Sequence, residues 1–237
     1  MSNNHDLIQQ LNNKLQNLPP DVLDASGRFL YSSGATMKKG DYYLIGKFPG
    51  GTPDDRYPIL RDEIIGWDER KKNAYLKEEW ENKGGYYPEG KSPYQLEVQK
   101  LCEVFKIDAE DVCASNWILT RSPKSTKMGD KKYKEYLAKI FAPLHEIIME
   151  IVQPKIVLAI SNGDEESAYK YVKEHFGFND MYKKCDGKWC CKVAQRKCKE
   201  KPQTLIGFPD FTYPWNSLSK DDREKITSHI ARECSKL

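Results

Sequence analysis

The sequence has no long apolar run and no secretory pattern at its start. Its 237 residues are 39% hydrophobic and 31% charged, and no apolar stretch approaches the roughly 20 residues that a bilayer-spanning helix needs. The first 20 residues are polar and rich in Asn and Gln, without a basic and then apolar order. We therefore expect a cytoplasmic protein without membrane contact, with a single domain over 1–237.

Cysteine is too scarce and too irregularly spaced for a disulfide framework. An odd number of cysteines, seven, is spread through a long chain, which indicates reduced thiols. Four of them follow a Cys-x4-Cys-Cys-x6-Cys pattern, at Cys185, Cys190, Cys191 and Cys198. This spacing differs from the paired Cys-x2-Cys knuckles of zinc sites. We expect no metal and no cofactor, with a metal at this cluster as the alternative to a basic hairpin.

Helical and strand patterns alternate along the chain. Strands that alternate with helices predict a three-layer α/β/α sandwich around a mostly parallel sheet of four to five strands. An N-terminal helix within 1–20 is expected to pack on the body, and 183–201 is a basic insertion or hairpin. Periodicity predicts helices over 5–18, 58–80, 93–106, 131–152, 165–176 and 219–235, a loop at 84–90, and strands at 42–46, 112–119, 154–160 and 204–207.

Four loops follow the predicted strands, at 46–53, 116–123, 161–164 and 208–215. Because the carboxyl ends of parallel strands meet at one edge of a sheet, we expect these loops to lie together, where open α/β sheets bind ligands. The first loop, 46–51, is rich in Gly and Pro, which ordinary turns also use. The loops taken together therefore indicate a site more strongly than the first loop alone.

Positive charge is concentrated in two segments, although the net charge is only +3. Segment 121–134 has six basic residues against one acid, and 183–201 has eight against two. Such runs are often only solvated faces, but two of them near the loops favour a polyanionic partner, DNA. The predicted DNA contacts are Arg121, Lys124, Lys127, Lys192 and Arg196, with Thr212 and Tyr213 from the last loop.

Four segments carry a family resemblance in a fixed order. Residues 46–50 read Gly-Lys-Phe-Pro-Gly, and 116–123 read Asn-Trp-Ile-Leu-Thr-Arg-Ser-Pro. A Pro-Leu pair at 143–144 precedes Pro-Lys-Ile-Val-Leu-Ala at 154–159, and the last loop begins Phe-Pro-Asp-Phe-Thr at 208–212. Over roughly residues 40–235 the chain resembles the uracil-DNA glycosylase superfamily, nearest in motif order to its iron-sulfur subgroup but without that subgroup's cysteine spacing.

The resemblance implies a monofunctional DNA glycosylase. Such a hydrolase flips a base out of the DNA and cleaves its N-glycosidic bond, leaving an abasic site. The first loop would cradle base or phosphate oxygens, Asn116 would read a pyrimidine edge, and Phe48 or Tyr57 would stack on the base. Turn formation by Asn116 and core packing of the aromatic rings are the structural alternatives. The implied substrate-binding residues are Gly46, Lys47, Phe48, Pro49, Gly50, Tyr57 and Asn116.

The chain departs from the family pattern at the catalytic positions. Phe48 stands where several subgroups have a water-activating Asp or Asn, so Asp54 and Asp55 are the nearest candidate bases. The last loop has Asp210 in place of the family's His, and Asp210 would orient water or stabilise the sugar cation. All four histidines lie outside the loops, at His5, His145, His175 and His229.

The replaced residues favour a noncanonical, modified pyrimidine over uracil. Defence against phage with hypermodified DNA is a role that would use such an enzyme. Three alternatives stay open: a uracil-DNA repair glycosylase, a catalytically silent DNA-binding or sensing module on the same fold, and an enzyme acting on free nucleosides. No obligate protein partner is indicated by the sequence.

Overall fold

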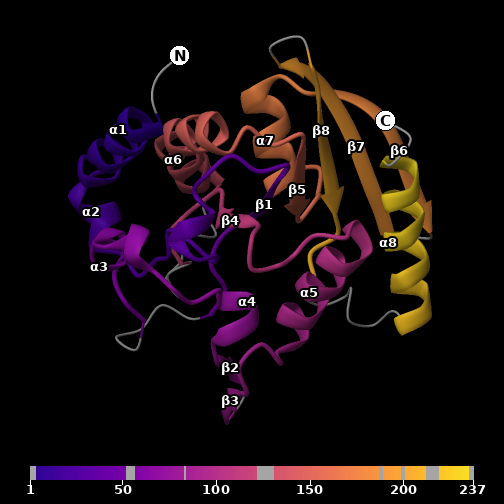
Figure 1. The fold of residues 1–237 in the computed structure, drawn as a ribbon, viewed down its shortest axis with the longest axis horizontal. Helices are drawn as coiled ribbons and strands as arrows, with labels where there is room; N and C mark the ends of the chain where they lie inside the picture. Colours follow the sequence, from indigo (N-terminus) through magenta and orange to yellow (C-terminus); the bar gives the residue numbers. More distant parts are fainter. Residues whose placement is uncertain are drawn as a thin grey trace.

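A six-stranded sheet runs through the molecule in the order β4-β1-β5-β8-β7-β6 (Figure 1). The computed structural model describes residues 4–51, 57–82, 84–121, 131–186, 189–198, 201–211 and 219–234. The first four strands of this order are parallel to one another, and β7 and β6 add an antiparallel pair. The strands are β1 (Tyr42–Gly46), β4 (Cys113–Asn116), β5 (Ile156–Ile160), β6 (Asn179–Asp186), β7 (Trp189–Cys198) and β8 (Lys201–Phe208).

Helices cover both faces of this sheet and give three layers (Figure 1). Alternate residues of β1 enter different cores: Tyr43 and Ile45 belong to one and Leu44 to the other. This alternation is expected of a strand buried on both faces. One core includes α1 (Asn4–Gln16), α6 (Lys131–Val152) and α7 (Ala168–Phe176). The other includes α4 (Ala74–Lys77) and α5 (Pro93–Phe105). Helix α8 (Lys220–Cys234) packs against α5.

The predicted mixed α/β architecture is confirmed, with corrections to the strands. The sheet has six strands instead of four to five, because 179–198 forms an antiparallel pair that extends β8. The strand predicted at 112–119 ends at Asn116, while the strand at 42–46 has the predicted bounds. The basic insertion is therefore part of the main sheet.

The helix predicted over 58–80 is wrong. This segment forms three short helical turns, and Gly66, at φ 66°, interrupts them in a left-handed conformation. The predicted loop at 84–90 begins with a strand, β3, that pairs with β2. The elements not yet described are α2 (Pro20–Leu23), η1 (Gly34–Thr36), α3 (Leu60–Ile64), η2 (Trp67–Glu69), β2 (Trp80–Asn82) and β3 (Gly85–Tyr87).

Helix ends follow the sequence closely. Ser92 caps α5 through a reciprocal pair of hydrogen bonds with Gln95. Ser219 accepts a hydrogen bond of 3.1 Å from the backbone amide of Asp222 at the start of α8. Helix α6 continues through Pro143 without a restart. Within the described ranges, none of the helices has the length and apolarity that crossing a bilayer requires.

The backbone of β8 packs so closely on α7 that it has no room for a side chain at Gly207. A Cβ there would lie 2.4 Å from Cδ2 of Tyr169, a buried ring. We expect Gly207→Ala to lower the free energy of unfolding by about 1–3 kcal/mol through overpacking, measured by urea denaturation. The control is Gly85→Ala, which meets nothing within 4 Å; equal stability of the two variants would contradict the packing.

Candidate functional site

The carboxyl ends of the four parallel strands meet at one edge of the sheet, named here the carboxyl edge. Gly46 at the end of β1 pairs with Asn116 at the end of β4, and Ile160 of β5 pairs with Phe208 of β8. The amide of Trp117 donates to the carbonyl of Gly46 at 2.8 Å. The four predicted loops therefore begin side by side at this edge.

The side chain of Asn116 lies against the backbone of Gly46. A Cβ on Gly46 would stand 2.0 Å from Oδ1 of Asn116 and 3.9 Å from the hydroxyl of Tyr94. Asn116 is 4% exposed and hydrogen-bonds the Tyr31 side chain. The carboxamide is thus held between the end of β1 and a tyrosine that sequence reasoning did not identify.

An aromatic cleft of about 610 Å³ lies beside this contact. Three predicted site residues line it, Gly50, Tyr57 and Arg121, but Asn116 does not and reaches it only through Tyr31. Residues of β2 and β3 line one side of the cleft. The side chains that give the cleft its character are Tyr31, Tyr57, Trp80, Tyr86, Tyr87, Arg28 and Arg121.

Two guanidinium groups lie over tyrosine rings in this cleft. Arg121 is centred 4.0 Å from the ring of Tyr57, and its Nε donates to the Gly50 carbonyl at 3.0 Å. Burial lowers the pKa of Arg121, which is 6% exposed. Arg28 lies 5.3 Å from the ring of Tyr31. Arg121 therefore joins the first and second loops and fixes Tyr57 by a cation–π contact.

Glu78 neutralises Arg28 within the protein. Glu78 accepts from Arg28 at 2.5 Å and also pairs with Arg70. Burial opposes the charge of Glu78, but the two arginines outweigh it and lower its pKa. The hydroxyl of Tyr57 donates to Glu81 at 2.7 Å. With these charges paired, the cleft offers ring faces and polar edges rather than a strong net charge.

The side chains of Lys47 and Phe48, which follow Gly46, lie outside the aromatic cleft. Lys47 lies 3.4 Å from Oε2 of Glu166, which Lys134 also contacts at 2.6 Å. Burial lowers the pKa of Lys47, and Glu166 counteracts this effect. Phe48 packs on the core that contains α1 and α6 and does not line the aromatic cleft. Of the two aromatic stacking candidates, only Tyr57 lies in the cleft.

Asp210 is exposed and follows the end of β8. Its negative charge favours the protonated forms of both Lys47, whose pKa burial nevertheless lowers, and Tyr94. Burial makes the larger contribution to the high pKa of Tyr94. Asp210 is therefore close to groups on both sides of the Gly46 backbone. Pro49, the remaining residue predicted in the first loop, is buried.

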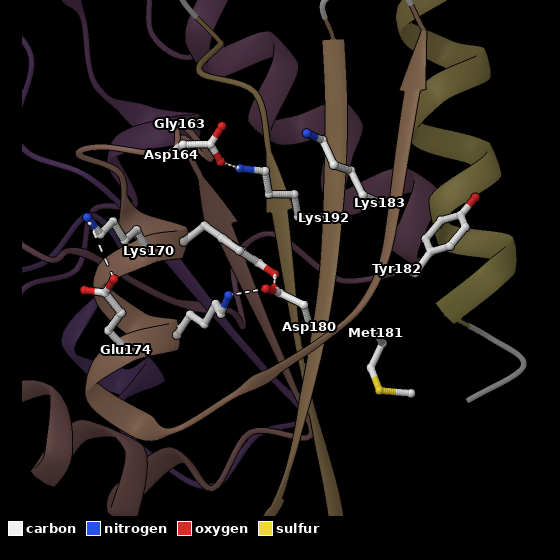
Figure 2. Close-up of a pocket in the computed structure, with 11 residues that line it drawn as sticks. Gly163, Asp164, Lys170, Glu174, Asp180, Met181, Tyr182, Lys183 and Lys192 are labelled. Atoms are coloured by element: carbon white, nitrogen blue, oxygen red, sulfur yellow. Dashed lines mark hydrogen bonds and ion pairs between the residues drawn. The ribbon is translucent and has the colours of Figure 1, made fainter.

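The structure separates the two basic residues predicted in β7. Lys192 pairs with Gly207 near the carboxyl edge and donates to Asp164 at 2.5 Å (Figure 2). Arg196 pairs with Gln203 toward the opposite end of β8 and donates to its side chain at 2.6 Å. The ring of Phe176 lies 4.8 Å from the Arg196 guanidinium. Arg196 thus stabilises the fold away from the carboxyl edge.

Six predicted residues lie outside the described part of the chain. In the described part, no group of three or more His, Cys, Asp or Glu side chains is placed to hold a metal ion. Of the clustered cysteines, Cys191 is buried and Cys198 is partly exposed. The residues outside the description are Asp54, Asp55, Lys124, Lys127, Thr212 and Tyr213.

A buried histidine contacts the backbone at the start of the second loop. Nε2 of His145 lies 3.0 Å from the carbonyl of Trp117, and Nδ1 lies 2.9 Å from the hydroxyl of Tyr43. A carbonyl can only accept, so Nε2 carries the hydrogen and Nδ1 accepts from Tyr43. The imidazole stacks on the Trp117 ring at 4.7 Å. His145 is thus a neutral support beneath Asn116 and Trp117.

Comparison with known proteins does not assign a family. No family model matches the chain, and no curated protein matches it. The resemblance to uracil-DNA glycosylases therefore depends on the four sequence segments at 46–50, 116–123, 143–159 and 208–212.

The fixed neutral state of His145 predicts a pH dependence of stability. Burial lowers its pKa to about 4, against about 6.5 in the unfolded chain. The unfolded chain binds the proton more tightly, so the free energy of unfolding should fall as pH decreases from about 6.5 toward 4. We expect a loss of about 2–3 kcal/mol between about pH 7 and 4.5 that is absent in His145→Gln. Parallel urea titrations of both proteins give this difference; identical pH profiles would contradict the assignment.

Proposed function

We propose that this protein is a DNA glycosylase of the uracil-DNA glycosylase type that removes a noncanonical, modified pyrimidine after base flipping. The observation that carries the proposal is the aromatic cleft at the ends of β1 and β4, which contains Gly50, Tyr57 and Arg121 from the predicted site. Its volume of about 610 Å³ falls within the range of about 300–1,000 Å³ typical of small-molecule sites. This size suits a base that carries an added group.

The chemistry of the cleft suits a flipped base better than a phosphate. Extruded bases stack on aromatic rings and guanidinium planes and are read by hydrogen bonds at their edges. Tyr57 and Arg121 provide such a stacked pair, and Tyr31 provides a hydroxyl backed by Asn116. Glu79 and Glu81 also line the cleft, and their charge disfavours a phosphate there.

Asp210 is the described carboxylate with a position suited to the hydrolytic step. It is exposed at the carboxyl edge, within the electrostatic influence of Lys47 and Tyr94. A carboxylate there would orient the attacking water and stabilise positive charge on the sugar. The water supplies hydroxide to C1′, and the departing base takes the electron pair of the N-glycosidic bond and a proton.

The test is excision from defined DNA. The purified protein is incubated with uracil-containing duplexes and single strands and with phage DNA that carries hypermodified cytosine or thymine, and abasic sites are detected by alkaline cleavage. We expect cleavage of modified DNA. Cleavage at uracil alone would identify a repair glycosylase instead, and DNA binding without cleavage of any substrate would identify a silent binding module.

Removal of the stacking ring should weaken excision selectively. Base–aromatic stacking contributes about 1–3 kcal/mol, so Tyr57→Ala should lower kcat/KM for excision about 10- to 100-fold. Tyr136→Ala is the matched control, because Tyr136 is an exposed tyrosine on α6 outside the cleft. Equal activity of the two variants in single-turnover kinetics would refute the assignment of the cleft.

Substitution at Asp210 should affect chemistry more than binding. Asp210→Asn keeps the size of the side chain and removes its charge, so we expect a fall in kcat of about 100-fold or more with nearly unchanged DNA affinity. Single-turnover excision and fluorescence anisotropy measure the two quantities on the same DNA. Unchanged kcat would exclude Asp210 from the hydrolytic step.

A further inference from the structure

A second cleft, named here the lysine cleft, lies between α7 and the β6–β7 pair (Figure 2). It has a volume of about 470 Å³ and includes Gly163 and Asp164 of the loop that follows β5. It therefore lies at the carboxyl edge. It is near β7 and β6, at the end of the sheet away from β4. Four lysines line it, Lys170, Lys173, Lys183 and Lys192.

Two of these lysines face each other across adjacent strands. Lys183 of β6 and Lys192 of β7 are register partners in the antiparallel pair. Directly opposed residues in an antiparallel pair lie on the same face of the sheet, and like charges in these positions are destabilising. An arrangement that costs stability in this way is favoured where an anion binds between the charges.

An internal carboxylate occupies this position in the free protein. Asp164 accepts from Lys192 at 2.5 Å, and Lys192 also donates to the carbonyl of Asn162 at 2.7 Å. Lys192 is well buried, with 14% of its side chain exposed, whereas the Asp164 side chain is 85% exposed. The lysine is therefore fixed by the fold, and the acid reaches it from the surface.

Other lysines of the cleft also act on Asp164. The hydrogen bond and charge of Lys192 lower the pKa of Asp164, with further contributions from Lys183 and Lys173. Lys173 pairs with Asp180, which also accepts from the Tyr169 hydroxyl at 2.9 Å. Asp164 is consequently an exposed anion bonded to Lys192, with weaker contributions from the charges of Lys183 and Lys173.

We propose that the lysine cleft binds a phosphodiester of the DNA backbone, and that Asp164 is an internal anion which this phosphate displaces. A phosphate oxygen would take over the contact of Asp164 with Lys192, while Lys183 approaches the same group from the neighbouring strand. The inference depends on the proposed function in one respect, that the partner is DNA. It assigns the backbone to the lysine cleft and the base to the aromatic cleft.

The test measures binding of DNA that contains no excisable base. Fluorescence anisotropy with an unmodified duplex is recorded over a series of salt concentrations. Lys183→Gln should weaken binding about threefold or more and reduce the slope of log K against log salt by about one. Lys192→Gln should have the same effect. Lys197→Gln is the matched control, since Lys197 is exposed on β7 opposite Pro202, toward the other end of the sheet.

The Asp164→Asn variant distinguishes competition between Asp164 and phosphate from a purely structural role of the Asp164–Lys192 ion pair. If Asp164 competes with phosphate, its neutralisation should tighten DNA binding about threefold or more, whereas loss of a purely structural ion pair would only lower stability. Unchanged or weaker binding by Asp164→Asn would overturn the proposal, as would equal effects of Lys183→Gln and Lys197→Gln. Because the probe has no target base, failure here leaves the excision assay unaffected, and failure of excision leaves this result unaffected.

Discussion

The candidate site depends on one close contact, between the Asn116 carboxamide and the backbone of Gly46. The contact has room only because Gly46 lacks a Cβ. Backbone pairing joins the ends of β1 and β4 at the same two residues, and the first and second loops leave the sheet from this point. Arg121 then joins these loops again through the carbonyl of Gly50. Beneath them, His145 bonds the Trp117 carbonyl and stays neutral because burial disfavours its charge.

Charge divides the carboxyl edge into two regions. In the aromatic cleft, Arg28 is neutralised by Glu78, and rings provide much of the contact surface. In the lysine cleft, the opposed pair Lys183 and Lys192 shares the influence of one exposed carboxylate, Asp164. A flipped nucleotide has both an uncharged ring and a charged backbone. Because β1, β5 and β8 lie between β4 and β7, the proposal assigns the flipped base to the aromatic cleft and a backbone phosphate of another nucleotide to the lysine cleft.

The sequence predicts the elements that have strong local periodicity. The buried strand at 42–46 and the helix at 131–152 have the expected bounds, since alternation and helical spacing are local properties. The helix predicted over 58–80 fails because charge periodicity says nothing about the left-handed turn at Gly66. The sheet has more strands than the sequence predicts because strand pairing beyond β8 is a long-range property.

The candidate site is predictable in part for the same reason. Loops that follow strands can be recognised locally, which identifies Gly50 and Arg121, whereas Tyr57 is implied by the family resemblance. Tyr31 and the aromatic residues of β2 and β3 join the cleft only through tertiary packing, and no local signal marks them. Arg196 lies opposite Gln203, away from the carboxyl edge, and a basic run does not reveal which end of a strand faces that edge.

The most direct test of this account is a crystal structure of the protein bound to DNA that carries one modified pyrimidine on a 2′-fluorinated, non-hydrolysable sugar. The account predicts an extruded base stacked on Tyr57 in the aromatic cleft, with Asp210 facing C1′. A duplex that stays fully stacked, or a base bound on another face of the sheet, would contradict it.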